Sequence, residues 1–300
     1  MSLQDTIAVR PVAEALQRAQ AGRGYWTRVR ERLVTDPVTM TVMTLLACIV
    51  IMVVAAPLVA THDPTAASVF ARLKPPGYQG HWLGTDEVGR DLWSRILYGG
   101  RLSLLCGVAP VAFALIVGGC LGLIAGYRGG LVNSLIMRSM DVLYAFPSIL
   151  LAIAICGMLG SGLGNTILAL TVTFIPPIVR ICETITTQVR SFEFVEAARA
   201  SGARPASIIC FHILNNVLGP ILVYSTSLIS ISIILAAGLS FLGLGVTPPD
   251  AEWGLMLNNL RQAIWVNPLV AALPGAMIFI TSMCFNLMSD GLRSAMDVRI

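Results

Sequence analysis

Charged side chains are scarce in this sequence. Only 12% of the 300 residues are Asp, Glu, Lys or Arg, 56% are hydrophobic, and the mean hydropathy is +0.78. Soluble globular domains have about 25% charged residues, so the composition excludes that class and indicates a protein embedded in a lipid bilayer. The formal net charge of +4 is small and gives no indication of a nucleic acid partner.

Lysine is nearly absent. The one lysine, Lys74, lies between Leu73 and Pro75. A phosphate-binding Walker motif requires a Gly-Lys pair followed by Ser or Thr, so the sequence excludes a Walker-type ATP site in this chain. If the protein uses ATP, a separate subunit must bind the ATP and Mg²⁺, and we expect no cofactor in this chain.

Histidine and cysteine patterns typical of enzymes and metal sites are also missing. His62, His81 and His212 fall outside the centres of the apolar runs, which disfavours an intramembrane enzyme with a serine–histidine pair. The seven cysteines have no short paired spacing and predict neither a disulfide nor a metal site. His81 lies near acidic residues, but without a helical histidine pair we expect no metal there.

Long apolar runs define the fold class. A membrane-spanning helix needs about 20 apolar residues, and one run, residues 142–179, is long enough for two spans separated by the glycine cluster at 160–164. The sequence therefore predicts an all-α polytopic protein with six transmembrane helices. The other four spans are predicted at residues 38–60, 102–127, 221–242 and 265–288.

Six spans place both termini on one side of the membrane. Most of the arginines fall on the side of the termini, which predicts that this side is cytoplasmic. We divide the chain into a cytoplasmic tail (1–36), a first anchor helix (37–60), a periplasmic segment (61–98) and a five-helix core (99–300). A cleaved signal peptide is the alternative for the first span, but the long arginine-rich segment before it favours an uncleaved anchor.

Residues 183–212 form the longest polar interruption of the second half. Val189, Phe192, Val195 and Ala198 recur at helical spacing between charged residues, which predicts an amphipathic helix with one apolar face. Gly202, followed by the proline at 205, predicts a bend and the start of a second helix. We interpret this segment as a cytoplasmic docking loop; a merely solvated helix–turn is the alternative.

The motifs of this chain resemble those of the C-type permease subunit in the dipeptide/oligopeptide/nickel family of binding-protein-dependent ABC importers. The resemblance covers about residues 35–300. It is carried by EAA at 196–198 with Gly202, HIL at 212–214, GTDEVGRD at 84–91, GRLSL at 100–104, LSFLGLG at 239–245, EWG at 252–254 and FNLMSDGLR at 285–293. One departure is Asn215, where the family usually has proline, so we expect a softer helix break there.

The resemblance implies a type I importer permease fold in a bacterial inner membrane. It implies that Glu196, Ala197, Ala198 and Gly202 contact a cytoplasmic ATPase. The implied partners are a B-type permease, two ATPases and a periplasmic substrate-binding protein. The implied cargo is a dipeptide or oligopeptide, with a nickel chelate or glutathione as alternatives. An ion-coupled carrier is a further alternative, but it should show acids within the spans and internal repeats.

Two charged segments are predicted on the periplasmic side. We expect a turn at 84–86 leading into a short helix on the membrane surface, with Arg90 and Arg95 facing water. We expect residues 239–261 to form an exposed loop with its tryptophan in the interfacial belt. The candidate contacts for a delivery protein are Asp86, Arg90, Asp91, Asp250, Glu252 and Trp253.

Three features inside the spans carry further predictions. The glycines at 118, 122 and 126 form a stripe that allows close helix packing. Arg138 and Asp141 are spaced to pair on one helix face, with a proton-relay role for the aspartate as the alternative. Prolines at 147 and at 176–177 are expected to break the hydrogen-bond ladders inside the third and fourth spans.

Overall fold

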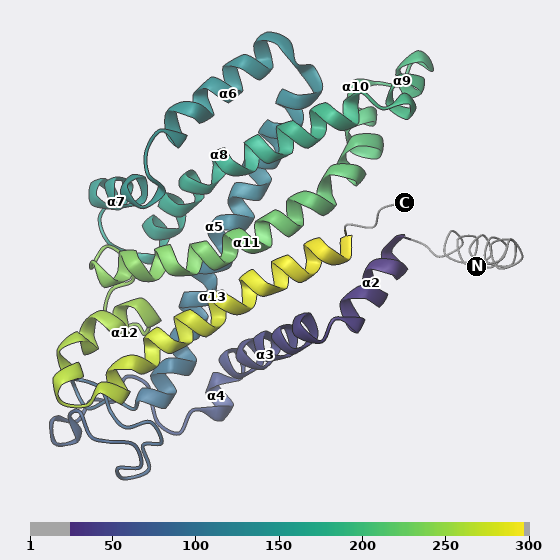
Figure 1. Cartoon of the computed structure of the whole chain (residues 1–300). Helices are drawn as coiled ribbons and strands as arrows, with labels where there is room; N and C mark the ends of the chain where they lie inside the picture. Colours follow the sequence, from purple (N-terminus) through teal and green to yellow (C-terminus); the bar gives the residue numbers. More distant parts are fainter. Residues whose placement is uncertain (1–24, 297–300) are drawn as a thin grey trace, which may run out of the picture.

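The structure is a computed structural model that describes residues 25–296, and in this range it is helical with no named strand. The chain runs through a tilted stack of long helices (Figure 1). In order, the elements are α2 (Tyr25–Thr35), α3 (Pro37–Val54), α4 (Ala56–Val59), η1 (Val69–Ala71), α5 (Leu92–Arg128), α6 (Gly130–Tyr144), α7 (Ser148–Leu159), α8 (Leu163–Arg190), α9 (Glu193–Ala200), α10 (Pro205–Ser207), the π-helix η2 (Ile208–Ile213), α11 (Leu214–Phe241), α12 (Trp253–Asn259), η3 (Leu260–Trp265) and α13 (Pro268–Met296).

Five of these segments are long and apolar enough to cross a membrane, and a sixth span results if the bent pair α6 and α7 counts as one. The predicted all-α fold with six spans is therefore confirmed. The five are α3, α5, α8, the continuous segment Pro205–Phe241 and α13.

Helix α5 is the axis of the molecule, and α8 packs along it. An added Cβ at Gly118 would meet Ile178, one at Gly122 would meet Cys182, and one at Gly126 would meet Thr186. Each four-residue step along α5 matches a four-residue step along α8, so the two helices run parallel. The glycine stripe packs within the subunit, because only glycine leaves room for the facing backbone of α8.

Gly122→Val is expected to destabilise the fold by about 2 kcal/mol, the usual cost of overpacking a tight contact. The new side chain would begin 2.5 Å from Cys182 Cβ and 2.8 Å from the Val179 carbonyl oxygen. Gly119→Val is the matched control, since a Cβ on Gly119 meets nothing within 4 Å. Thermal unfolding in detergent measures both; equal midpoints for the two variants would contradict the packing described here.

The third span is broken, while the fourth is not. Helices α6 and α7 meet at an angle of 84°, with the break just before Pro147, as predicted. At Pro176 and Pro177 the ladder lacks two N–H donors, as predicted, but α8 continues through both residues. Helix α8 packs along α5, and in membranes neighbouring helices compensate for the hydrogen bonds that proline removes.

Asp141 forms an ion pair with an arginine on another helix, and not with Arg138 as predicted. Its Oδ1 lies 2.6 Å from Nη2 of Arg180 on α8, so the predicted pair with Arg138 is wrong. The spacing on α6 permitted the local pair, but the fold brings a closer cation from 39 residues away.

The start of α5 is covered, not exposed on a membrane surface. Leu92, Ile96 and Arg95 are buried, and α5 runs on from Leu92 to Arg128 without a separate surface helix. The predicted surface helix, with Arg95 facing water, is therefore wrong. The segment 251–263 folds back over this part of α5 and shields it from solvent.

Candidate functional site

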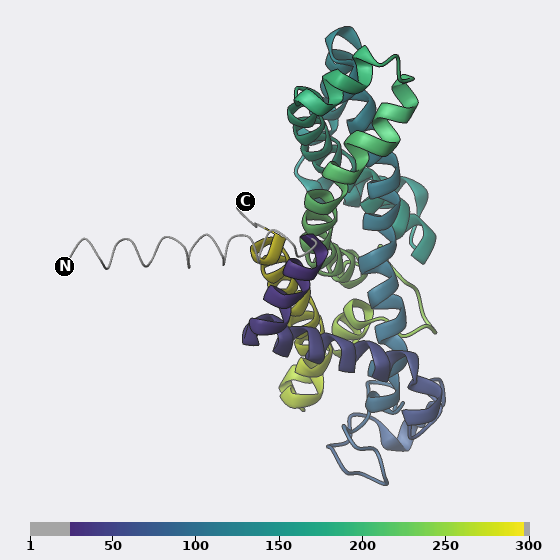
Figure 2. The same ribbon diagram turned by 90° about the vertical axis from the view of Figure 1, so that its right-hand side faces the viewer.

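The predicted docking loop forms two helices joined by a bend. Helix α9 is followed by Gly202, whose φ of +77° falls in the left-handed region that glycine adopts without strain. Pro205 then occupies the first turn of α10, as predicted. Figures 1 and 2 show α9 at one end of the molecule, opposite α12 and the loops between α4 and α5.

One face of α9 packs on the bundle, and the other faces outward. Val195 is fully buried against Val189 and Ile208. Glu196, Ala197 and Gly202 are exposed, and Ala198 is half-buried against the apolar cluster. Three of the four residues implied to contact an ATPase therefore lie on an open surface.

Two phenylalanines extend that surface. Phe192 and Phe194 are 50% and 42% exposed, and their rings meet edge to face with centroids 5.8 Å apart. The prediction that Phe192 belongs to the buried face is wrong, because the helix begins only at Glu193. Phe194 was missed because it lies outside the recognised motif; its place directly after Glu193, near the start of a charged segment, was the available signal.

The loop is fixed to the ends of the long helices. Arg190 Nη1 donates to the Tyr127 carbonyl oxygen at 3.0 Å, and the Arg199 guanidinium lies 5.2 Å from the centre of the Tyr127 ring. These contacts tie α8 and α9 to the end of α5. A displacement of α9 is therefore passed to α5 and α8 together.

The return to the membrane passes through a π-helical stretch. Residues 208–213 form η2, and α11 then runs through Asn215 without a break. The Asn215 side-chain amide donates to the Phe211 carbonyl oxygen at 3.1 Å. The softer break expected at Asn215 therefore takes the form of a wider helix just before it.

The GTDEVGRD motif builds a buried ion-pair cluster. Asp86 Oδ2 lies 2.7 Å from Arg90 Nε and 3.3 Å from Arg95 Nε, and Glu87 pairs with Arg90 at 3.1 Å. Burial, and then the neighbouring Asp86 carboxylate, raise the pKa of Glu87. The ion pair between Asp86 and Arg95 joins the segment before α5 to the first turn of α5.

Asp91 caps α5 and joins two histidines. Its carboxylate accepts hydrogen bonds from the Ser94 backbone N–H and hydroxyl, at 2.8 and 2.6 Å. The His81 ring nitrogen lies 2.9 Å from Asp91 Oδ1, the His62 ring stacks on His81, and potential ligand atoms of the three residues lie within 4.8 Å of one another. The spacing of these residues in the sequence did not reveal this cluster. Its nitrogen and oxygen atoms could bind a cation, but the Asp91 carboxylate is hydrogen-bonded to His81 and Ser94.

The loop after α11 is exposed for much of its length, as predicted, but its end at Glu252 and Trp253 is buried. Trp253 is fully buried and its indole N–H donates to the Ile96 carbonyl oxygen at 2.9 Å. Glu252 caps α12 and accepts hydrogen bonds from Gly254 N, Leu255 N and the Ser103 hydroxyl. The predicted placement of Trp253 in an interfacial belt is wrong, because α5 and α12 close around it.

Comparison with known proteins identifies the family. The family model "Binding-protein-dependent transport system inner membrane component" matches residues 118–300. The chain belongs to this family of permeases. A second model, "N-terminal TM domain of oligopeptide transport permease C", matches residues 24–76 and confirms the resemblance to C-type subunits.

Relatives of the permease match along most of its length. It is 39% identical to the probable D,D-dipeptide transport system permease protein DdpC of Escherichia coli (strain K12), over 99% of this chain and 97% of that protein. It is 39% identical to the dipeptide transport system permease protein DppC of Alkalihalophilus pseudofirmus, over 92% of this chain and 90% of that protein. It is 44% identical to the glutathione transport system permease protein GsiD of Pectobacterium atrosepticum, over 77% of each.

A solved structure agrees in fold. The inward-facing MetNI methionine ABC transporter matches with a TM-score of 0.55 at 20% identity, covering 67% of this chain and 96% of that chain. The permease is thus a multi-pass inner-membrane subunit of a bacterial ABC importer, a class that works with ATPase and binding-protein partners.

Most of the predicted periplasmic contact residues are not on the permease surface. Asp86, Asp91, Glu252 and Trp253 are at most 2% exposed, and Arg90 is largely covered by its ion pairs. The prediction of direct contact is therefore wrong for the four buried residues, since their side chains are used to join α5 to the segments packed around it. Asp250 is exposed and stays a candidate.

Asp91→Ala is expected to lower the free energy of unfolding at pH 7 by about 2 kcal/mol, through loss of the helix cap. Burial raises the pKa of Asp91, but hydrogen bonds from Ser94, His81 and Thr61 outweigh it and hold the pKa below its usual value. The carboxylate therefore stabilises the fold above the unfolded pKa of about 3.9 and loses this effect as pH falls through the folded pKa.

The difference in the free energy of unfolding between the wild type and Asp91→Ala should therefore become smaller as the pH falls below about 4. Thermal unfolding at pH 7 and at acidic pH measures it. Asp250→Ala is the control, since the Asp250 side chain is exposed and caps no helix in the described part of the chain. A difference in the free energy of unfolding that does not change with pH would contradict the stabilising role of the Asp91 carboxylate.

Proposed function

We propose that the permease forms half of the translocation pathway for dipeptides or oligopeptides in an ATP-driven importer. The observation that carries the proposal is the outward face of α9, with Glu196, Ala197 and Gly202 exposed at the end of a helix fixed to α5 and α8. Such a face fits a groove in a separate motor protein. The cargo assignment rests on relatives named for dipeptide and D,D-dipeptide transport.

The proposed assembly has four kinds of component besides the lipid bilayer: this subunit, a homologous B-type permease, two cytoplasmic ATPases and a periplasmic substrate-binding protein. ATP and Mg²⁺ bind to the ATPases, and this chain has no catalytic role of its own. The single lysine in a Leu-Lys-Pro context supports this division of work.

The proposed topology has both termini in the cytoplasm. The arginines of the predicted inner side include those of the N-terminal segment, of residues 190–204 and of the end of α13, and this bias supports the assignment. Glu196→Cys should accordingly react with a membrane-impermeant thiol reagent from the cytoplasmic side; wild-type cysteines at other sites give the background.

Glutathione is the second candidate cargo, supported by the 44% identical glutathione permease. A nickel chelate is the third. The binding protein is expected to decide among them, so its ligand should be identified first.

Uptake by the reconstituted assembly tests the proposal. Proteoliposomes with both permeases, both ATPases and the loaded binding protein should accumulate labelled dipeptide only when ATP is supplied, and an uncoupler should have no effect. Uptake that continues without ATP and collapses with the uncoupler would instead identify an ion-coupled carrier. Assemblies without the ATPases are the control.

A further inference from the structure

Asp141 and Arg180 lie on candidate membrane-spanning segments, the bent pair α6 and α7 and the helix α8, at the two ends of the apolar run 142–179. Arg180 precedes the last residue of α8, Arg190, by ten positions, which is about 15 Å along the helix. The two side chains are 57% and 49% exposed. Charged groups at the end of a span are costly where they face lipid, so we infer that the surface that carries them faces water or another protein.

An aromatic ring and a cavity lie close to the ion pair. The Arg180 guanidinium lies 5.2 Å from the centre of the Tyr144 ring, whose side chain is exposed. A cavity of about 340 Å³ begins at the break between α6 and α7, and its lining includes Tyr144, Pro147 and Thr173.

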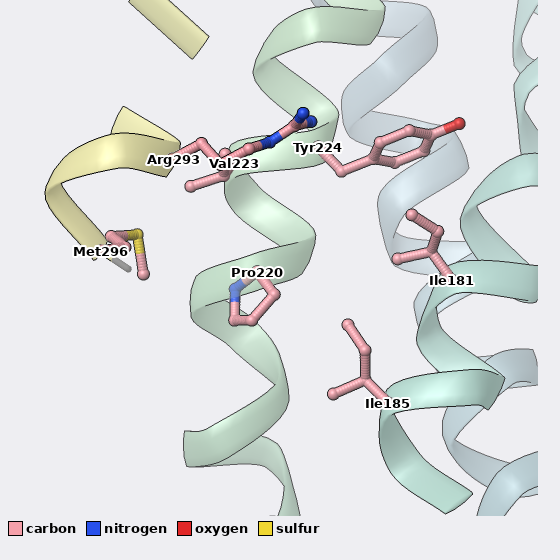
Figure 3. Close-up of a pocket in the computed structure, with 7 residues that line it drawn as sticks. All are labelled: Ile181, Ile185, Pro220, Val223, Tyr224, Arg293 and Met296. Carbon is pink, nitrogen blue, oxygen red and sulfur yellow. The ribbon is translucent and has the colours of Figure 1, made fainter. Parts of the chain in front are cut away.

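A second cavity, of about 410 Å³, starts at the residue next to Arg180. Its lining includes Ile181, Tyr224 and Arg293. Figure 3 shows Tyr224 reaching from α11 toward Ile181 on α8, with Arg293 behind α11. Along α8, the ion pair therefore lies between these two cavities.

The pair is weakly held and has bonding capacity left. Half-exposed ion pairs contribute little to stability. Among residues 25–296, the Arg180 side chain forms one hydrogen bond, to Asp141, although a guanidinium has five N–H donors. Opening the pair would therefore cost little, and both charges could then bind other ions.

We propose that Arg180 and Asp141 form a binding site for a zwitterionic cargo on the translocation pathway. Arg180 receives the terminal carboxylate of a passing peptide, and Asp141 receives its terminal ammonium group. The exchange replaces one ion pair by two, and because both new pairs are half-exposed the peptide is held weakly enough to leave again. The inference rests on the proposed peptide import and specifies the chemistry that the pathway recognises.

The test combines variants of the subunit with variants of the cargo. In the reconstituted assembly, Arg180→Gln should lower the uptake of a dipeptide with a free carboxylate about tenfold, the effect of losing one charge-assisted hydrogen bond. It should leave uptake of the same dipeptide as its C-terminal amide unchanged. Asp141→Asn should show the mirror pattern, with the N-acetylated dipeptide unaffected.

The stimulation of ATPase activity by the loaded binding protein is measured in the same vesicles, and it should stay at the wild-type level, because delivery and coupling do not use the pair. Arg138→Gln is the matched control, since Arg138 is exposed on α6 and has no ion pair within residues 25–296. It should change uptake of neither cargo.

A purely structural ion pair gives different results. Arg180→Gln would then lower the uptake of dipeptide and amide equally or not at all, and the charge-swapped double variant Asp141→Arg with Arg180→Asp would restore wild-type uptake. Loss of co-purification with the second permease in Arg180→Gln would assign the pair to the subunit interface instead. Any of these results overturns the inference, whereas a wild-type assembly that transports no peptide overturns the proposed function itself.

Discussion

Gly202→Asp is expected to lower ATP-driven uptake about 100-fold while leaving membrane insertion intact. A Cβ at Gly202 meets nothing within 4 Å in the subunit, so the substitution meets no clash in the fold. In the proposed assembly the same surface would lie against an ATPase, and an unpaired charge buried at an interface costs about 2–5 kcal/mol. Uptake and ATPase stimulation in proteoliposomes measure the loss.

Gly202→Asn separates the charge from the backbone geometry. Asparagine tolerates the positive φ of +77° better than most residues and carries no charge, so we expect it to keep most of the transport activity. Gly202→Asp with wild-type uptake would show that the bend does not approach a motor protein. An equal loss in both variants would show that the contact excludes any side chain.

Glu252→Lys is expected to abolish folding of the subunit, and not merely docking of a delivery protein. Glu252 is 1% exposed and accepts hydrogen bonds from two N–H groups of α12 and from Ser103 on α5. The lysine would remove the cap and bury an unpaired cation, at a cost of about 3–5 kcal/mol. The yield of monodisperse protein in detergent and its thermal midpoint measure the effect.

Asp250→Lys is the matched variant two residues away on an exposed position. It should leave folding unchanged, and reduced uptake in this variant would place the binding protein at this loop. A Glu252→Lys subunit as stable as the wild type would contradict the buried cap.

The sequence predicted those structural features that are determined by residues close together in the chain. The apolar runs predicted the spans, the glycines at 118, 122 and 126 predicted a packed stripe, and Gly202 with the following proline predicted the bend. Each depends on residues within one or two helical turns, where spacing and backbone preference decide the outcome.

The errors came from contacts distant in sequence. Trp253 looked like an interfacial residue, but its indole bonds to Ile96, 157 positions away. Arg95 looked solvated until the fold placed it beside Asp86 under the segment 251–263. No periodicity within a segment reveals which distant segment covers it, so burial of these polar residues needed the three-dimensional structure.

The continuity of α5 has a mechanical consequence. Its 37 residues form one helix, about 55 Å long, attached at its first turn to the hydrogen-bonded hub of Asp91 and at its last turn to Arg190. A rod of this length that tilts by about 10° about one end moves the other end by about 10 Å. In the proposed topology, a tilt of this one helix would couple a movement at the docking loop to the opposite side of the membrane, with no chain of side-chain rearrangements between them.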